Sequence, residues 1–261
     1  RGQKIGELEN LPTMTDPYRY AALRMLVTVT PPVFIGRPSL FPIVALSMVD
    51  LCVKGGNSEL AAYAYVEYSL LFVGVNGDVE SGYQFGRLAL LLLEKYQATE
   101  VKGQVYLVFN FFVRHWKEHI RFTIEPLLEA WQSSLEIGDV EYACYAACFY
   151  CSYLFLSGET LDTVRQKHTH YLDFLQKFQR EFQYFYAKIW YQLTLKLQEE
   201  SDPSASLNGE DFDTDEMATF LQDSNNHMSV FSLYLAQTML AYIMKDYRQA
   251  VVWAQRGMKY E

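Results

Sequence analysis

The chain is 261 residues long and half of its residues are apolar, so it can bury a substantial core and is not a disordered segment. Asp and Glu total 31 against 22 Lys and Arg, a net charge of −9 with no basic stripe, which argues against a protein that neutralises nucleic-acid phosphates. The 20 Tyr and 17 Phe residues, with only 20% charged residues, predict a surface that suits partner binding.

Residues 1–14 precede the first predicted helix, and we expect them to be a linker remnant. The N-terminus lacks the basic start, apolar run and cleavage site of a secretory signal and begins without Met, which indicates a piece of a longer protein. The longest uninterrupted apolar stretches, such as Leu88 to Leu93, are much shorter than the roughly 18 to 20 residues that a membrane-spanning helix needs. We therefore expect no transmembrane segment.

The rest of the chain is dominated by helical patterns. Six of the eight prolines lie before residue 43, so two long stretches contain few of the strongest helix breakers. Apolar residues recur there at three- and four-residue steps, and strand alternation is absent over any useful length. The pattern predicts helices at about 15–30, 38–53, 58–74, 78–97, 100–117, 119–137, 139–157, 160–180 and 182–199.

The last third of the chain begins with a polar segment. Pro, Ser, Asn, Gly and acidic residues predict a loop near residues 200–213. Thr214 then begins a short helix, because its hydroxyl and the following acidic residues suit the free N–H groups of a helix start. A final hairpin is predicted with helices at about 227–244 and 247–259.

Turn signals repeat along the chain at a nearly fixed period. Asp78, Glu118 and Glu159 each stand in a predicted turn, and they follow one another at separations of 40 and 41 residues. A second set of breaks falls between them, so each period holds two helices joined by a short turn. Residues 15–261 are therefore predicted to form one all-α domain of stacked antiparallel helical hairpins.

The final hairpin resembles a tetratricopeptide repeat. Tyr247, Ala250 and Ala254 reproduce the spacing of an aromatic and two small residues in the second helix of that family, and Gly82 and Gly86 stand in corresponding places. Small residues there let one helix lie close against the next, which offsets a helix cost of up to about 1 kcal/mol for each glycine. The resemblance implies a right-handed superhelix of helical hairpins.

A wider resemblance covers nearly the whole chain. The segments that carry it are residues 11–17, 77–86, 114–119 and 156–159. They resemble the helical region of large bacterial multi-sensor signal-transduction multi-kinases. In those proteins a serine/threonine kinase domain and an AAA-type ATPase domain precede this region, and sensor and histidine-kinase domains follow it. The resemblance implies a non-catalytic fragment of a protein that is itself a kinase, with two-component signalling as its context.

Three of the four cysteines, Cys144, Cys148 and Cys151, fall at i, i+4 and i+7 and therefore on one helix face. Disulfides between such neighbours would be strained, and a secreted disulfide framework would spread its cysteines along the chain, so a reducing cytoplasm is the better interpretation. A Cys-only metal site is the alternative to small buried residues at a close helix contact, which we favour.

The sharpest catalytic pattern is His115 to His119, which matches the His-x-x-Glu-His zinc motif of inverted metallopeptidases, with Glu118 as the residue that activates water. The repeat period places a turn at Lys117 and Glu118, so the two histidines are not expected to share one helix face. A zinc-dependent hydrolase therefore stays only a remote alternative. We expect no metal or cofactor, and we expect Trp116 to be a buried, stabilising residue.

The sequence favours binding over catalysis. We predict a non-catalytic module for protein–protein interaction or intramolecular signal relay, whose partner is another protein or another domain of the same polypeptide, with no nucleic-acid or membrane partner. The alternative is a sensor for a small effector, held by aromatic side chains in the groove of the superhelix. The predicted contact residues are Arg114, Trp116, Glu118, Tyr145 and Tyr153, since binding surfaces favour aromatic and arginine side chains.

Overall fold

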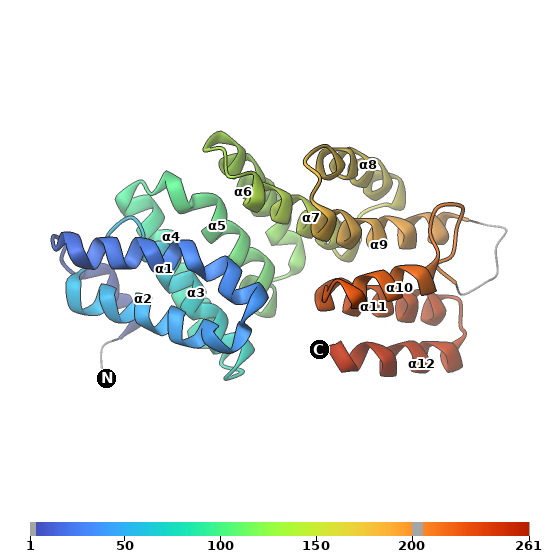
Figure 1. Ribbon diagram of the computed structural model, residues 1–261, viewed down its shortest axis with the longest axis horizontal. Helices are drawn as coiled ribbons and strands as arrows, with labels where there is room; N and C mark the ends of the chain where they lie inside the picture. The colour runs from blue at the N-terminus through green and yellow to red at the C-terminus, as the bar shows by residue number, and fades with distance from the viewer. Residues whose placement is uncertain (1–3, 200–205, 261) are drawn as a thin grey trace. The chain divides into compact units, whose positions relative to one another are not determined.

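The computed structural model describes residues 4–199 and 206–260, and most of them are helical (Figure 1). Within these ranges β-pairing is limited to two isolated bridges, so the prediction of an all-α protein is confirmed. The α-helices are α1 (Pro17–Gly36), α2 (Phe41–Gly55), α3 (Ala61–Gly74), α4 (Val79–Tyr96), α5 (Thr99–Val108), α6 (Ile124–Glu136), α7 (Val140–Leu156), α8 (Leu161–Lys177), α9 (Glu181–Gln198), α10 (Thr214–Asp223), α11 (His227–Ile243) and α12 (Tyr247–Gly257).

The chain divides into two compact units, Arg1–Ala146 and Ala147–Glu261, with the division inside α7. In the first unit α1 packs on α2, α2 on α3, α3 on α4 and α5 on α6. Helix α3 forms the centre of this unit, where Leu60, Tyr63 and Tyr65 are fully buried. Successive helices therefore form neighbouring layers, as the blue and cyan ribbons of Figure 1 show for α1, α2 and α3.

The second unit uses the same principle. Helix α8 packs on α9, α9 on α11, α10 on α11 and α11 on α12. Trp190 and Leu193 of α9 and Leu233 of α11 lie in its core. Helices α8 and α12 bury one stripe, as the three- and four-residue apolar spacing predicts, whereas α9 and α11 lie between neighbours and are buried on more than one side.

Several helix connections share one turn design. A residue with positive φ ends one helix. The side chain of the next residue then accepts a hydrogen bond from a backbone N–H in the first turn of the following helix. Gly77 (φ +65°) and Asp78 are an example, with the Asp78 carboxylate accepting the Ser81 N–H at 3.0 Å. Glycine tolerates this backbone conformation, and Asp and Asn are preferred helix caps. The same design recurs at residues 138–139, 225–226 and 245–246.

Two glycines of α4 permit the close helix packing that the sequence predicts. A Cβ on Gly82 would lie 2.5 Å from Val73 Cγ2, and one on Gly86 would lie 2.2 Å from Phe109 Cδ2. No side chain fits at these contacts without displacing a neighbour. In the final hairpin, by contrast, only Ala250 of the three repeat-like positions is buried, while Tyr247 and Ala254 are exposed.

Three helix predictions are wrong in detail. Helix α1 does not end near residue 30 but continues through Pro31 and Pro32 to Gly36. Packing overrides the helix-breaking tendency here, because Phe34 beyond the prolines meets Phe41 of α2 with ring centroids 5.2 Å apart.

The helix predicted at 100–117 is also shorter than expected. It ends at Val108 and is followed by a π-helical turn (Phe109–Val113) and a 3-10 turn (Arg114–Trp116). A second 3-10 turn (Ile120–Thr123) precedes α6, which therefore begins at Ile124 and not near residue 119. Insertion of a π-turn shifts the register of the side chains that follow it.

The segment expected to be a linker remnant includes packed residues. A 3-10 helix (Ile5–Asn10) buries Leu8, and Asn57 Nδ2 donates a hydrogen bond of 2.7 Å to the Leu8 carbonyl. The loop predicted near 200–213 lies partly outside the described residues, at 200–205. Its described part buries Leu207 and Phe212, and Asp213, not Thr214, caps α10.

One described helical stretch, Pro38–Gly55, is long and apolar enough to cross a membrane when judged by length and composition alone. It spans 18 residues with a mean hydropathy of 1.4, and 22% of it is buried. It contains no long uninterrupted apolar run, because Ser47 and Asp50 interrupt the stretch. Its buried face, formed by Ala45, Met48 and Cys52, packs into the first unit.

Candidate functional site

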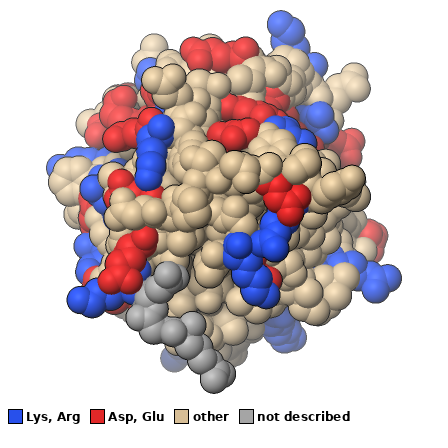
Figure 2. Space-filling view, turned by 90° about the vertical axis from the view of Figure 1, so that its left-hand side faces the viewer, with Lys and Arg blue, Asp and Glu red and all other residues tan. Residues whose placement is uncertain are grey.

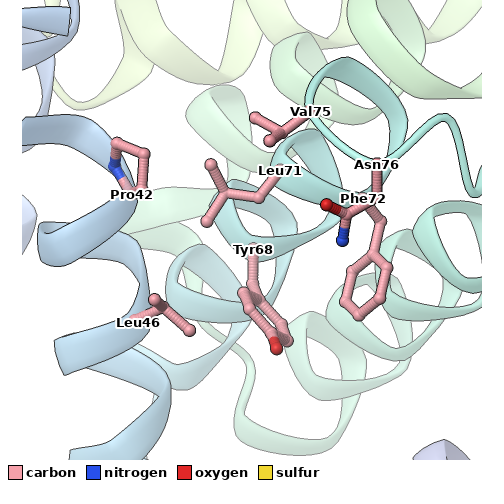
Figure 3. Close-up of a pocket in the computed structure, with 7 residues that line it drawn as sticks. All are labelled: Pro42, Leu46, Tyr68, Leu71, Phe72, Val75 and Asn76. Atoms are coloured by element: carbon pink, nitrogen blue, oxygen red, sulfur yellow. The ribbon is translucent and has the colours of Figure 1, made fainter. Parts of the chain in front are cut away.

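An apolar groove lies between α2 and α3 in the first unit (Figure 3). Its volume is about 190 Å³. Figure 3 shows side chains of α2 on one side and those of α3 and the following turn on the other. The lining residues are Pro42, Leu46, Tyr68, Leu71, Phe72, Val75 and Asn76. None is charged, so the groove suits an apolar side chain of a partner.

Aromatic packing makes the α3 wall of this groove rigid. Tyr68 meets Phe72 edge-to-face at 5.0 Å between ring centroids, and Phe72 stacks on Phe85 of α4 at 5.3 Å. Below them Phe41, Ala45 and Leu71 form a buried cluster. Because these contacts fix the side chains in advance, a ligand that enters the groove orders few of them on binding.

The surface around the groove has few charges. Between Met25 and Val49 the sequence contains one charged residue, Arg37. Leu40, Ile43 and Leu46 are exposed although they are large and apolar. Figure 2 shows one face of the molecule, where basic and acidic side chains are interspersed around an uncharged centre. Monomers rarely expose contiguous apolar patches above a few hundred Å², so such a patch is typical of an interaction site.

Two of the predicted contact residues, Arg114 and Glu118, are brought together, but in an internal network. Arg114 Nη2 lies 2.8 Å from Glu118 Oε2, and its Nη1 donates to Asn110 Oδ1 at 3.2 Å. The Tyr83 hydroxyl of α4 donates to the other Glu118 oxygen at 2.5 Å. The Arg114 hydrogen bond, followed by that from Tyr83, lowers the pKa of Glu118. These groups tie α4 to the irregular segment after α5.

The predicted contact residue Trp116 is 60% exposed, so the expectation that it is buried is wrong. The π-turn before it changes the register and directs the indole outward. Its ring lies 5.1 Å from that of His115, measured between centroids. Trp116 remains accessible to a partner.

The two histidines of the zinc-like pattern lie on either side of a turn, as predicted. His115 belongs to one 3-10 turn, while His119 caps the next and accepts the Arg121 N–H on its Nδ1 at 3.1 Å. Burial lowers the pKa of His115. In the part of the chain that the structure describes, no three His, Cys, Asp or Glu side chains are grouped to hold a metal ion.

The predicted contact residues on α7 differ in exposure. Tyr145 is half-buried and meets Tyr142 edge-to-face, whereas Tyr153 is buried in the second unit. Tyr153 is therefore a core residue, since its helical position faces the packed interior. All four cysteines are buried, as the structural interpretation of the Cys144, Cys148 and Cys151 face predicts.

A buried carboxyl group, Glu67 of α3, was not identified from the sequence. It is 4% exposed, and the Tyr63 hydroxyl hydrogen-bonds to it. The Tyr63 hydroxyl also lies 3.1 Å from that of Tyr142 on α7. Burial raises the pKa of Glu67 to about 7, against the smaller lowering effect of the Tyr63 hydrogen bond. In the sequence Glu67 merely occupies an apolar position of the helix pattern.

No protein-family model matches the chain. The chain is similar to hybrid signal transduction histidine kinase G of Dictyostelium discoideum, with 26% identity over 188 residues. The matched region is 71% of this chain and 5% of that protein, so the chain spans about one twentieth of the relative's length. The sequence resemblance was to bacterial proteins, whereas this relative is from Dictyostelium discoideum.

Proposed function

We propose that the chain is a non-catalytic helical-repeat module of a large signalling kinase, and that it binds an amphipathic helix of a protein partner or of another domain of the same polypeptide. The observation that carries the proposal is the uncharged groove between α2 and α3, bordered by exposed apolar residues. Helix-in-groove recognition uses apolar anchors one helical turn apart, which match a groove of this kind.

Two further observations support a signalling context and a repeat architecture. The matched relative is by name a signal transduction histidine kinase. Within each unit the helices pack on others that are close in the sequence, and the turn of residues 77–78 recurs at 138–139 and 245–246. We infer that the hairpins stack as a tetratricopeptide-like right-handed superhelix, because each hairpin can bury its apolar face only against its neighbours. A cytoplasmic location belongs to the same proposal.

The effector-sensor alternative has one observation in its favour. A hollow of about 300 Å³ on the second unit is lined by Arg165, Gln166, Thr169 and Tyr191 of α8 and α9. These side chains offer a cation, an amide, a hydroxyl and a phenol, which suit a small polar anion. Drug-sized ligand sites range from about 300 to 1,000 Å³, so this hollow lies at the lower limit.

The groove is tested by measuring the binding of the purified chain to the other domains of the polypeptide that contains it. Leu46→Glu and Val75→Glu should each weaken the complex at least tenfold, because a carboxylate cannot be desolvated in an apolar groove without a partner. Met258→Glu, at an apolar site on the second unit that is about as exposed as Val75, is the matched control and should bind as the parent does. Unchanged binding by both groove variants, or no complex with any of these domains, would contradict the proposal.

A further inference from the structure

The outward side of α1 carries a continuous uncharged stripe. Its exposed residues follow one another at steps of three and four along the whole helix: Tyr18, Ala21, Met25, Thr28, Pro32 and Ile35. This average period of 3.5 residues is that of a coiled-coil seam, in which the residue at every step contacts the partner helix. The opposite side of α1, with Leu23 and Thr30, is the one buried in the first unit. The exposed stripe therefore has the residue spacing needed to contact one more helix, on the side of α1 opposite to the buried one.

The large apolar side chains of the stripe are strongly exposed. Tyr18 is 86% exposed, Met25 69% and Ile35 56%. The helix has 20 residues and a length of about 30 Å, so these side chains form a long apolar surface. Only Arg19 and Arg24 are charged within α1, and both are ion-paired, with Asp16 and Glu100 respectively. No charge of the stripe itself opposes contact with another uncharged helix.

We propose that the outward stripe of α1 pairs with the same stripe of a second copy of this chain, with the two helices antiparallel. In this register Tyr18 faces Ile35, Ala21 faces Pro32 and Met25 faces Thr28. The proposal concerns α1 alone and does not depend on the groove between α2 and α3.

The charges at the two ends of α1 select this arrangement. Asp16 precedes the helix and Arg37 follows it, and the antiparallel register brings the Asp16 of each copy to the Arg37 of the other. Arg37 is exposed and forms no ion pair among the described residues, so its charge is available. A parallel pair would instead place like charges together at both ends. Antiparallel helix dipoles also attract each other, whereas parallel ones repel.

Charge also favours a second copy over a membrane surface. Helices that lie on membranes carry many Lys and Arg residues on their polar face, where they attract anionic lipids. Helix α1 has two arginines, both neutralised within the chain, and the whole chain carries −9. A self-complementary apolar stripe gives a closed, two-fold symmetric contact, which is the commonest form of soluble assembly.

Sedimentation velocity tests the pairing on the 261-residue chain over about 1 to 100 µM, the range in which a modest interface associates. We expect a dimer for the parent chain and a monomer for Met25→Glu at every concentration, with an unchanged far-UV spectrum. Val251→Glu, an exposed apolar site on α12, should remain dimeric. A parent chain that stays monomeric, or a Met25→Glu variant as dimeric as the parent, would overturn the proposal.

Cysteine cross-linking tests the direction of the helices, because the four native cysteines are buried and should not compete. A mixture of Tyr18→Cys and Ile35→Cys proteins should cross-link on oxidation, whereas Tyr18→Cys alone should remain largely uncross-linked. Self-cross-linking of Tyr18→Cys as fast as in the mixture would show a parallel pair and refute the register. If the chain is monomeric and binds anionic vesicles, and Met25→Glu abolishes that binding, then the stripe binds a membrane surface and the proposed dimer is refuted.

The end charges give a matched test of register. Arg37→Glu places a carboxylate against Asp16 of the other copy and should weaken the dimer at least tenfold. Adding Asp16→Asn removes that repulsion while keeping a good helix cap, so the double variant should recover part of the affinity. If Arg37→Glu dimerises as the parent does, the two ends do not meet and the antiparallel register is wrong.

Discussion

Helices α2 and α3 are neighbours of similar apolar character with opposite exposure. Each contains few charged residues: Asp50 and Lys54 in α2, and Glu67 in α3. Yet α3 is buried on nearly every side, since α2, α4 and α5 all pack against it. Helix α2 buries one stripe and leaves Ile43, Leu46 and Val53 exposed.

The difference shows that an apolar composition predicts that a helix contacts other groups. It does not tell whether those groups belong to the same chain or to a partner. A helix that is hydrophobic all round is normally a core helix, and α3 fits that rule. Helix α2 has the composition of a core helix, but one of its sides is left exposed by the residues that the structure describes. Its exposed side borders the groove, where the proposed partner helix binds.

The largest expected effect separates two leucines that line the same groove. Leu71 of α3 is buried and Leu46 of α2 is half exposed. Leu71→Ala should lower the free energy of unfolding by about 2 to 5 kcal/mol, because it leaves a cavity in the core. Leu46→Ala should cost about 1 kcal/mol or less, since half of its side chain already contacts water. Urea unfolding measures both, and equal losses would show that the two helices are not distinct in this way.

The next effect concerns the one charged residue of the buried helix. The carboxyl group of Glu67 has a pKa near 7 in the folded chain and an ordinary value of 4.5. The folded chain therefore holds the proton more tightly, so the contribution of Glu67 is most favourable below about pH 4.5 and is lost as the pH rises to about 7. Above that pH a carboxylate is buried beside the Tyr63 and Tyr142 hydroxyls, and the first unit is destabilised.

Glu67→Gln tests this pH dependence because glutamine keeps the shape and stays neutral. A difference of about 2.5 between the two pKa values corresponds to about 3 kcal/mol, so the variant should gain roughly that stability at pH 8 and little at pH 5. The comparison is made from urea unfolding curves at both pH values. A constant difference between parent and variant across the pH range would mean that the carboxyl group does not titrate near neutrality.

Most helices were predictable from the sequence because local rules decide them. The turns at residues 77–78 and 138–139 combine a glycine that adopts positive φ with an acidic cap, and both signals can be read directly. Lys117 and Glu118 looked like a third such turn at the right period. The chain there forms two 3-10 turns, the second of them capped by His119, because the π-turn after α5 shifts the register.

The groove was not predicted, since it depends on which neighbour a helix lacks. The sequence did contain a signal, the single charge between Met25 and Val49, but apolar character alone does not separate α2 from α3. The predicted contact residues followed side-chain type instead of exposure. Arg114 and Glu118 therefore belong to an internal network, Tyr153 is a core residue, and Trp116 is accessible.

A third prediction extends the comparison of buried and exposed residues to the segment after α5. Arg114 is hydrogen-bonded to Glu118 and Asn110 and largely buried, so Arg114→Ala should lower the free energy of unfolding by about 1 to 3 kcal/mol. Trp116→Ala should cost about 1 kcal/mol or less, not the 3 to 5 kcal/mol of a buried aromatic, because the indole is mostly exposed. Thermal unfolding measures the stability of both variants. A larger loss of stability for Trp116→Ala than for Arg114→Ala would mean that the indole is buried after all.

The smallest expected effect is the sharpest test of the exposed side of α2. Ile43 is mostly exposed, and glutamine is at least as good a helix former as isoleucine, so Ile43→Gln should change the free energy of unfolding by no more than about 0.5 kcal/mol. Ala45, two residues further along α2, is fully buried, and Ala45→Gln should be strongly destabilising, because it forces a larger polar group into the packed core. Both variants are measured by urea unfolding, together with the binding of a hydrophobic dye to the folded state. Ile43→Gln should lower dye binding because it removes exposed apolar surface.

If Ile43→Gln instead lowered the free energy of unfolding by more than about 1 kcal/mol, Ile43 would have to pack against another part of the chain. In that case α2 would be a core helix like α3, and the groove would not be a free surface.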